Sequence, residues 1–196
     1  MPPIKYNYFH WGPFLFHTKI SQEECDILIE AGKKCRKPSN DFGHRLAGHL
    51  AEQYTLTQFE WLNKYFEAYL IGYEKWRGRK YTSSPFELKS FWINYMKANE
   101  FNPPHNHGGD ISFVIYVDVP KEITQENKDF KGTLNGPGGI SWIYGEMNIQ
   151  CINVAQRMPA TRDFFIFPAF LKHWVFPFRS DVERVSVSGN IVVKDS

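Results

Sequence analysis

The spacing of apolar residues predicts a helix that begins near residue 21. Ser21-Gln22-Glu23-Glu24 is a capping box, because the serine hydroxyl can accept from a first-turn amide while Glu24 accepts from the amide of the cap residue. The small and apolar residues that follow recur at helical spacing: Cys25, Leu28, Ile29 and Gly32. They form one stripe, so the helix is amphipathic and packs against a core.

A second amphipathic helix is predicted between residues 57 and 78. Thr57-Gln58-Phe59-Glu60 repeats the capping signal, and Gly78 is a typical residue to end the helix. The apolar face consists of Phe59, Leu62, Phe66, Tyr69 and Tyr73. Two helices therefore precede the rest of the chain.

The pattern changes to period 2 after Pro85, which indicates strands. Phe86, Leu88, Ser90, Trp92 and Asn94 share one face, while Phe91, Ile93 and Tyr95 share the other. Further strand-like runs cover residues 111–119, 139–144, 163–167 and 184–193. Turn-forming segments such as Asn102-Pro103-Pro104 separate these runs. The polar segment 120–131 is predicted to be an exposed loop and a candidate lid.

Helices followed by strands indicate an α+β fold that is mainly β. We expect a double-stranded β-helix, that is, a cupin-like jelly roll, with the N-terminal helices packed on its sheet. One domain should span residues 1–196, with a helical layer at about 20–80 and a jelly-roll core at about 86–193.

Composition narrows the class of protein. The net charge of +2, from 23 basic and 21 acidic residues, gives no electrostatic case for binding nucleic acid. No apolar run approaches the roughly 20 residues that a membrane span needs. Three cysteines without metal spacing favour a reducing compartment. We expect a soluble cytoplasmic protein, located in the host cytoplasm if the source is a phage.

Histidine spacing points to a metal site. His105 and His107 stand at i and i+2 on an extended segment, so both imidazoles project to the same side. His173, far downstream, can supply a third ligand and leave coordination positions open, as in non-haem Fe(II) oxygenases. Asp110 is a competing acid, and it could face the same way only if Gly108-Gly109 forms a bulge.

The last predicted strand has one wholly polar face. Arg184, Ser186, Ser188 and Asn190 alternate there with the apolar residues Val185, Val187 and Ile191. On a half-exposed strand this face would meet solvent. In a jelly roll with a cofactor site it would point into the barrel, where an arginine offers a bidentate fork for a carboxylate.

These motifs resemble the 2-oxoglutarate and Fe(II)-dependent oxygenase superfamily. The resemblance is to its prolyl-hydroxylase-like branch and to oxygenase-like proteins of bacteria and tailed phages. It covers about residues 20–193 and is most specific in segments 92–116 and 165–190. It implies Fe(II) at His105, His173 and His107, 2-oxoglutarate as co-substrate, and O₂ in the open position.

The resemblance also implies the co-substrate site. Arg184 and Ser186 match the pair that holds the distal carboxylate of 2-oxoglutarate in many members of the superfamily. Tyr95 stands close to where prolyl-hydroxylase-like proteins place a tyrosine on that carboxylate. The remaining candidate pocket residues are Ser112, Tyr116 and Asn190.

One departure from the family pattern leaves alternatives open. The superfamily usually has His-x-Asp/Glu, and here His107 occupies the carboxylate position. The site could therefore be a three-histidine centre, a centre with only His105 and His173, or part of a pseudoenzyme.

The leading hypothesis is a dioxygenase that hydroxylates a small molecule or a protein side chain and releases succinate and CO₂. The alternatives are a three-histidine cupin-type dioxygenase that does not use 2-oxoglutarate, and a non-catalytic metal-binding module or virion-associated protein. A homodimer is left open.

Overall fold

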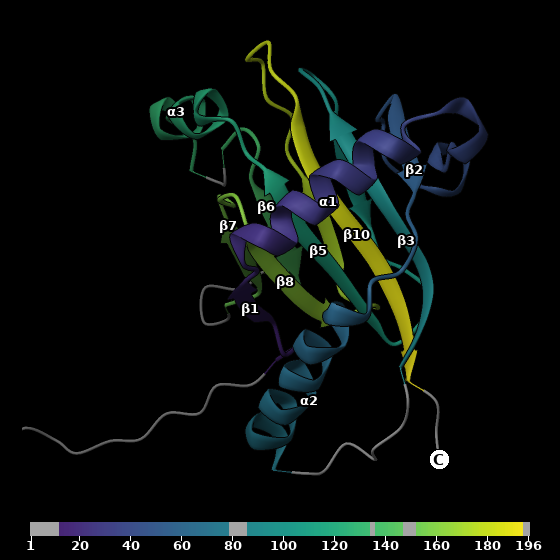
Figure 1. Ribbon diagram of the computed structural model, residues 1–196. Helices are drawn as coiled ribbons and strands as arrows, with labels where there is room; N and C mark the ends of the chain where they lie inside the picture. The colour runs from purple at the N-terminus through teal and green to yellow at the C-terminus, as the bar shows by residue number, and fades with distance from the viewer. Residues whose placement is uncertain (1–11, 79–85, 134–135, 147–151, 194–196) are drawn as a thin grey trace, which may run out of the picture.

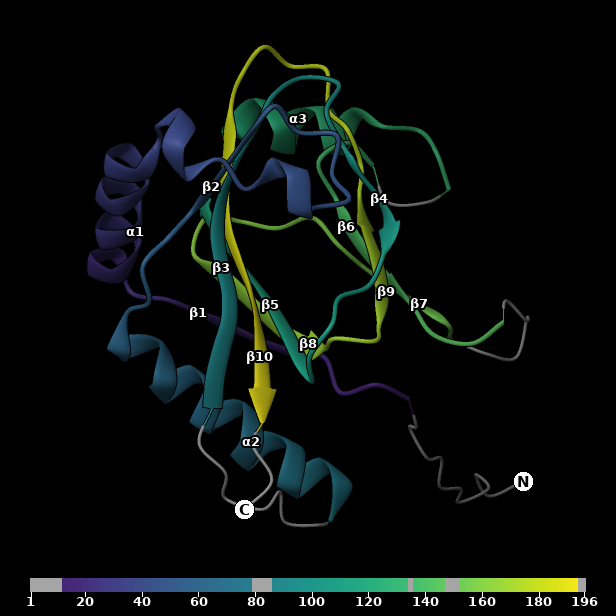
Figure 2. The same ribbon diagram turned by 90° about the vertical axis from the view of Figure 1, so that its right-hand side faces the viewer.

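The computed structural model describes residues 12–78, 86–133, 136–146 and 152–193. Two antiparallel sheets face each other across a common interior (Figure 2). The larger sheet has six strands in the order β1 (Phe16–Lys19), β8 (Asp163–Pro168), β5 (Ile111–Asp118), β10 (Arg184–Val193), β3 (Phe86–Met96) and β2 (Glu52–Thr55). The smaller sheet has four, in the order β4 (Asn102–His105), β9 (Lys172–Val175), β6 (Ile140–Ile143) and β7 (Val154–Arg157).

Two helices cover the outer face of the larger sheet, α1 (Gln22–Cys35) and α2 (Asn63–Arg77) (Figure 1). The capping box predicted for α1 is present, with both of its hydrogen bonds between Ser21 and Glu24. Helical packing on one face of a two-sheet sandwich confirms the predicted fold class, a mainly β jelly roll with an N-terminal helical layer.

The start predicted for the second helix is wrong. A 3₁₀ turn at Glu60–Leu62 leads into α2, and neither element has a side-chain cap. Burial of Leu62, Phe66 and Tyr69 against the sheet stabilises this segment instead. The end is as predicted, because Gly78 adopts a left-handed conformation with φ of 68° and its amide bonds to Glu74.

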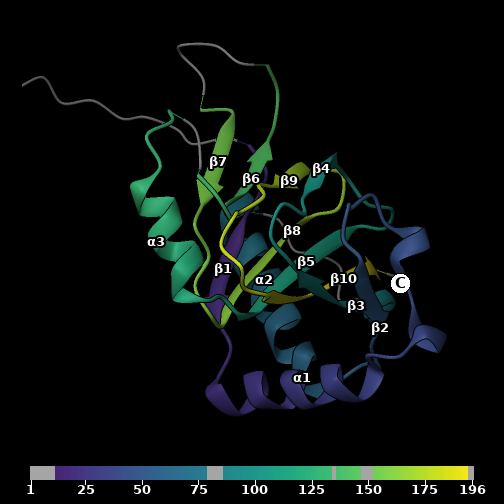
Figure 3. The same ribbon diagram turned by 90° about the horizontal axis from the view of Figure 1, so that it is seen from above.

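The prediction of an exposed loop at residues 120–131 is also wrong, since this segment contains a third helix, α3 (Lys121–Asp129). Only Ile123 is buried in this helix, so its sequence lacks the apolar stripe on which the prediction depended. The helix lies at the end of the sandwich where β10 begins, away from α1 and α2 (Figures 1 and 3).

Strand alternation divides the interior into two cores. On β5, Ile111, Phe113 and Ile115 face the helices. Val114 and Tyr116 point the other way, into the space between the two sheets. The same alternation on β10 sends its apolar residues toward the helices and its polar residues between the sheets.

The five runs predicted as strands are all present, whereas the short strands β1, β2, β4, β7 and β9 were not predicted. Asn102-Pro103-Pro104, predicted to be a breaker, forms most of β4. This strand is at the edge of its sheet, where a proline without an N–H group is tolerated. Within the described residues, no helix combines the length and the apolar character needed to span a membrane.

Candidate metal centre and co-substrate pocket

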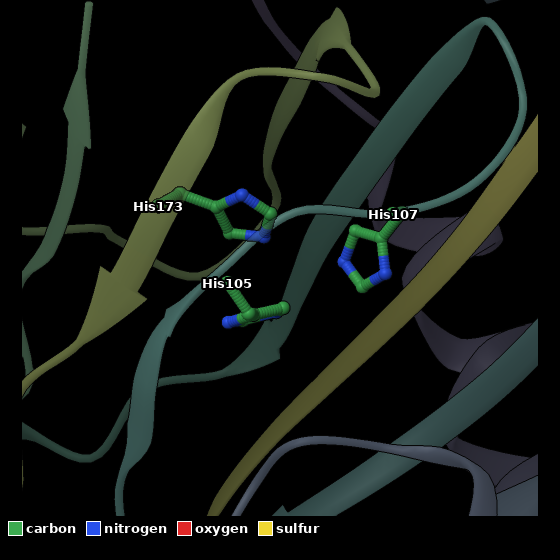
Figure 4. Close-up of side chains that lie close together, drawn as sticks. All are labelled: His105, His107 and His173. Atoms are coloured by element: carbon green, nitrogen blue, oxygen red, sulfur yellow. The ribbon is translucent and has the colours of Figure 1, made fainter.

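Three imidazoles converge between the sheets (Figure 4). His105 ends β4, His173 lies on β9, and the two are direct cross-strand partners. His107 follows two residues after His105, where its amide bonds to the carbonyl of Ala169 at 3.0 Å. One ring nitrogen from each histidine lies within 4.8 Å of the other two, so a single ion can be shared.

Backbone carbonyls orient two of the rings. Nδ1 of His105 lies 2.7 Å from the carbonyl oxygen of Pro103, and Nδ1 of His173 lies 2.9 Å from that of Leu171. Because a carbonyl only accepts, each Nδ1 carries the proton and donates. Nε2 of each ring is left with a free lone pair, which is the usual preparation of a histidine for metal binding.

Burial keeps these imidazoles neutral. It lowers the pKa of His173 to about 3 and that of His107 to about 4, and in both cases the nearby His105 adds to the effect. Burial also lowers the pKa of His105. At neutral pH each ring is therefore uncharged, with one nitrogen whose lone pair is available to a metal ion.

Asp110 does not join the cluster. Its carboxylate accepts from the amide of Val193 at 2.8 Å, and its own amide bonds to the carbonyl of Ile191. Gly109, with φ of 99°, turns the chain so that Asp110 faces the end of β10. Over the part of the chain that the structure describes, the cluster of possible metal ligands consists of three histidines and no acid.

Arg184 is a buried cation in the same cavity. Its Nη1 donates to the carbonyl of Gly138 at 2.8 Å, its Nη2 contacts the sulfur of Met96 at 2.8 Å, and its Nε has no hydrogen-bond partner among the described residues. Burial lowers its pKa, and no Asp or Glu among the described residues pairs with it. An unpaired buried charge is costly, so this position suits an anion.

Two further polar side chains stand beside the arginine. Ser186 on β10 and Tyr116 on β5 are register partners, and the Tyr116 ring lies 5.3 Å from the guanidinium carbon. The Tyr116 hydroxyl is buried and has no hydrogen-bond partner among the described residues, and burial raises its pKa to about 12. It therefore stays protonated and can donate to an anion.

These residues line one cavity between the sheets, with a volume of about 50 Å³. Its walls include both the candidate metal ligands and the polar residues around the buried arginine: His105, His107, His173, Tyr116, Arg184 and Ser186. The polar face predicted for the last strand thus points into the barrel and not to solvent.

Comparison with known proteins agrees with this geometry. Residues 90–190, more than half of the chain, match the profile of the family described as "Putative 2OG-Fe(II) oxygenase". The chain belongs to this family of 2OG-Fe(II) oxygenases. The matched residues include every histidine of the cluster as well as Arg184 and Ser186. None of the curated proteins that were compared matches the chain.

Solved structures show the same fold at low sequence identity. A prolyl-4-hydroxylase from Pseudomonas putida is 12% identical, with 92% of this chain and 93% of that chain covered at a TM-score of 0.56. A viral collagen prolyl hydroxylase from Paramecium bursaria Chlorella virus 1 is 15% identical (92% and 96%, TM-score 0.53). HygX from Streptomyces hygroscopicus, with nickel and 2-oxoglutarate bound, is 8% identical (92% and 83%, TM-score 0.56).

One predicted pocket residue of this oxygenase lies on the wrong side of the sheet. Tyr95 packs under α1, with its hydroxyl against Gly32 and its ring 4.0 Å from the guanidinium carbon of Arg36. The reason is parity, because Tyr95 has the alternation of Ile93 while Asn94 faces the cavity.

Ser112 and Asn190 face the interior but do not line the described cavity of the oxygenase. The Ser112 hydroxyl donates to the Asn190 side-chain oxygen at 2.7 Å, and the Asn190 amide donates to the Ser90 hydroxyl at 3.0 Å. Their polar groups are thus satisfied by one another across β5, β10 and β3. Their predicted role in co-substrate binding is not supported by this placement.

The sequence prediction missed an amide network in the cavity wall. Trp92 Nε1 donates to Asn94 Oδ1 at 3.1 Å, and Gln53 Nε2 donates to the same oxygen at 2.8 Å. The Asn94 amide faces the hydroxyls of Ser186 and Ser188 at 3.4 Å. The sequence did contain a signal for Asn94, because alternation put this polar residue on the same face of a buried strand as Trp92. Nothing in the sequence pattern pointed to Gln53.

Proposed function

We propose that His105, His107 and His173 hold the Fe(II) of this oxygenase and that Arg184, with Ser186 and Tyr116, holds the distal carboxylate of 2-oxoglutarate. The family supplies the reaction, which is hydroxylation of a substrate coupled to release of succinate and CO₂. One observation carries the assignment of residues. Arg184 is a buried cation without a carboxylate partner among the described residues, and it lines the cavity that contains the three histidines.

Fe(II), when bound with 2-oxoglutarate, supplies the oxygen chemistry. The residues of this chain bind the metal and the co-substrate and orient them. The carbonyls of Pro103 and Leu171 hold two imidazoles in the ligating tautomer. Arg184 fixes the far end of the co-substrate, because a planar guanidinium can pair with both oxygens of a carboxylate. The apolar side chains between the sheets exclude water.

Neutral His107 changes the charge of the site. With an imidazole where most of the superfamily has a carboxylate, the metal centre is more positive by about one unit. This added charge favours the dianionic co-substrate, and it should make oxidation of the metal harder. The proposal is that the oxygenase works with this three-histidine set, acting in the cytoplasm on a small molecule or a protein side chain within one domain.

The same donor set favours a second candidate. A three-histidine centre also suits a dioxygenase that does not use 2-oxoglutarate, in which Arg184 would bind a carboxylate of the substrate itself. The two candidates predict different dependence of oxygen use on the co-substrate.

The test is 2-oxoglutarate turnover by the Fe(II)-loaded protein. Even without its own substrate, the proposed enzyme should convert 2-oxoglutarate slowly to succinate, and omission of Fe(II) should stop this conversion. The His105→Ala, His173→Ala double variant is the control. Fe(II)-dependent oxygen uptake without succinate would favour the second candidate and contradict the first.

A further inference from the structure

The carbonyl that holds Arg184 belongs to a glycine in a constrained turn. Gly138 accepts from Nη1 of Arg184 at 2.8 Å, and Gly138 itself has φ of 72°. A side chain at this position would be strained by that φ and would collide with Ile123 of α3. The position of the carbonyl therefore depends on a residue without Cβ packed on α3.

Helix α3 also holds the chain on both sides of this contact. The Asn127 amide donates to the carbonyl of Pro137 at 2.9 Å, next to Gly138. The Glu126 carboxylate accepts from the amides of Arg179 and Ser180 at 2.9 to 3.0 Å and from the Ser180 hydroxyl at 2.7 Å. The second set of bonds fixes the loop that leads directly into Arg184.

These bonds determine which part of the guanidinium is free. Nη1 donates one N–H to Gly138 and Nη2 points one toward Met96, while Nε has no partner in the described part of the chain. A guanidinium has five N–H groups in a fixed plane, so three remain for a ligand. If the Gly138 carbonyl moved, the guanidinium plane could rotate, and the three remaining N–H groups would no longer point at a fixed position in the cavity.

We propose that α3 is a positioning clamp for the co-substrate arginine, with Gly138 and Glu126 as its two contact points. The clamp acts on Arg184 through the turn at Gly138 on one side and through the loop that precedes β10 on the other. It rests on the proposed function, in which Arg184 binds the distal carboxylate of 2-oxoglutarate. Gly138 and Glu126 are positioning residues, because neither lines the cavity and both act through Arg184.

The experiment compares two ligands that differ only at the clamped end. Calorimetry under anaerobic conditions measures the Kd of 2-oxoglutarate and of 2-oxopentanoate, which has a methyl group in place of the distal carboxylate, with Fe(II)-loaded protein. In Gly138→Ala the Kd of 2-oxoglutarate should rise at least tenfold, while that of 2-oxopentanoate should change less than twofold. A general loss of structure would weaken both ligands alike.

Gly145→Ala is the matched control. Gly145 also has a positive φ, of 77°, but it is exposed and an added Cβ would meet no atom within 4 Å. It should leave both Kd values unchanged. Should Gly138→Ala fail to fold, Glu126→Ala replaces it. Gln125→Ala is then the control on the same helix, because among the described residues the Gln125 side chain bonds only to Asp129. Glu126→Ala should raise the Kd of 2-oxoglutarate about threefold or more.

The clamp is overturned if a folded Gly138→Ala or Glu126→Ala protein binds 2-oxoglutarate as the wild type does, or loses both ligands equally. Failure of the proposed function is a different result. In that case the wild type itself would not distinguish 2-oxoglutarate from 2-oxopentanoate, and Arg184→Ala would have no effect on either.

Discussion

His105 and His173 face each other as cross-strand partners, with ring centroids 4.3 Å apart. The pairing of β4 with β9 thus brings together two candidate ligands that are far apart in sequence. It also makes the geometry of the site depend on a sheet rather than on a loop, which limits how far either imidazole can move.

The first prediction concerns iron retention. His105→Ala or His173→Ala should abolish stoichiometric Fe(II) binding, because each removes one of three ligands. His107→Ala should weaken binding at least tenfold, or about 1.4 kcal/mol. Metal analysis after anaerobic gel filtration measures this. Full retention of iron by the His105→Ala, His173→Ala double variant would disprove the centre.

A second prediction separates His107 from Asp110. Asp110→Asn should leave Fe(II) affinity unchanged, because the Asp110 carboxylate bonds to the amide of Val193 and an amide oxygen can accept that bond. His107→Asp recreates the usual triad of the superfamily and should keep or raise succinate formation. Loss of iron in Asp110→Asn would show that Asp110 and not His107 is the ligand.

The third prediction compares two buried tyrosines. Tyr116→Phe should raise the Kd of 2-oxoglutarate severalfold, since it removes a hydroxyl on a ring beside Arg184 that bonds to none of the described residues. Tyr95→Phe should not change it, because Tyr95 lies under α1. Calorimetry with the Fe(II)-loaded variants measures both Kd values. An effect of Tyr95→Phe as large as that of Tyr116→Phe would contradict the placement of the pocket.

The residues around the cavity show which features of the site could be predicted from the sequence and which could not. Period-2 alternation predicted that Arg184 and Ser186 share one face and that Asn94 shares a face with Trp92, and the structure places both faces between the sheets. It could not show that Ser112 and Asn190 satisfy each other, since that depends on the pairing of β5 with β10. Gln53 was not predicted, because β2 is a four-residue edge strand. Gly138 was predicted only as part of a turn, because a glycine in the sequence gives no sign that its carbonyl will contact an arginine side chain.

The fourth prediction concerns pH and stability. Glu52 bonds to Arg36 and Lys97, and these cations lower its pKa to about 2, below its ordinary value. Its contribution to the free energy of unfolding is therefore fully present above about pH 4.5 and is lost as pH falls toward 2.

Glu52→Gln should accordingly lower the free energy of unfolding at pH 7 by about 1 kcal/mol, with the difference from wild type disappearing near pH 2. Urea denaturation across this pH range measures it. The control is Glu30→Gln, which breaks an exposed pair with Lys33 on α1 and should have a much smaller effect. A difference that stays constant over the whole range would contradict the assignment to charge.

The most direct measurement of the central claim is calorimetric titration of 2-oxoglutarate into the anaerobic, Fe(II)-loaded wild type, Arg184→Lys and Arg184→Ala. Truncation leaves the distal carboxylate buried and unpaired, a loss of roughly 2 to 5 kcal/mol. We predict a Kd raised several hundredfold in Arg184→Ala and clearly raised in Arg184→Lys, which cannot form the fork, with iron content unchanged. Equal affinity in wild type and Arg184→Ala, or no binding to the wild type, would contradict the account.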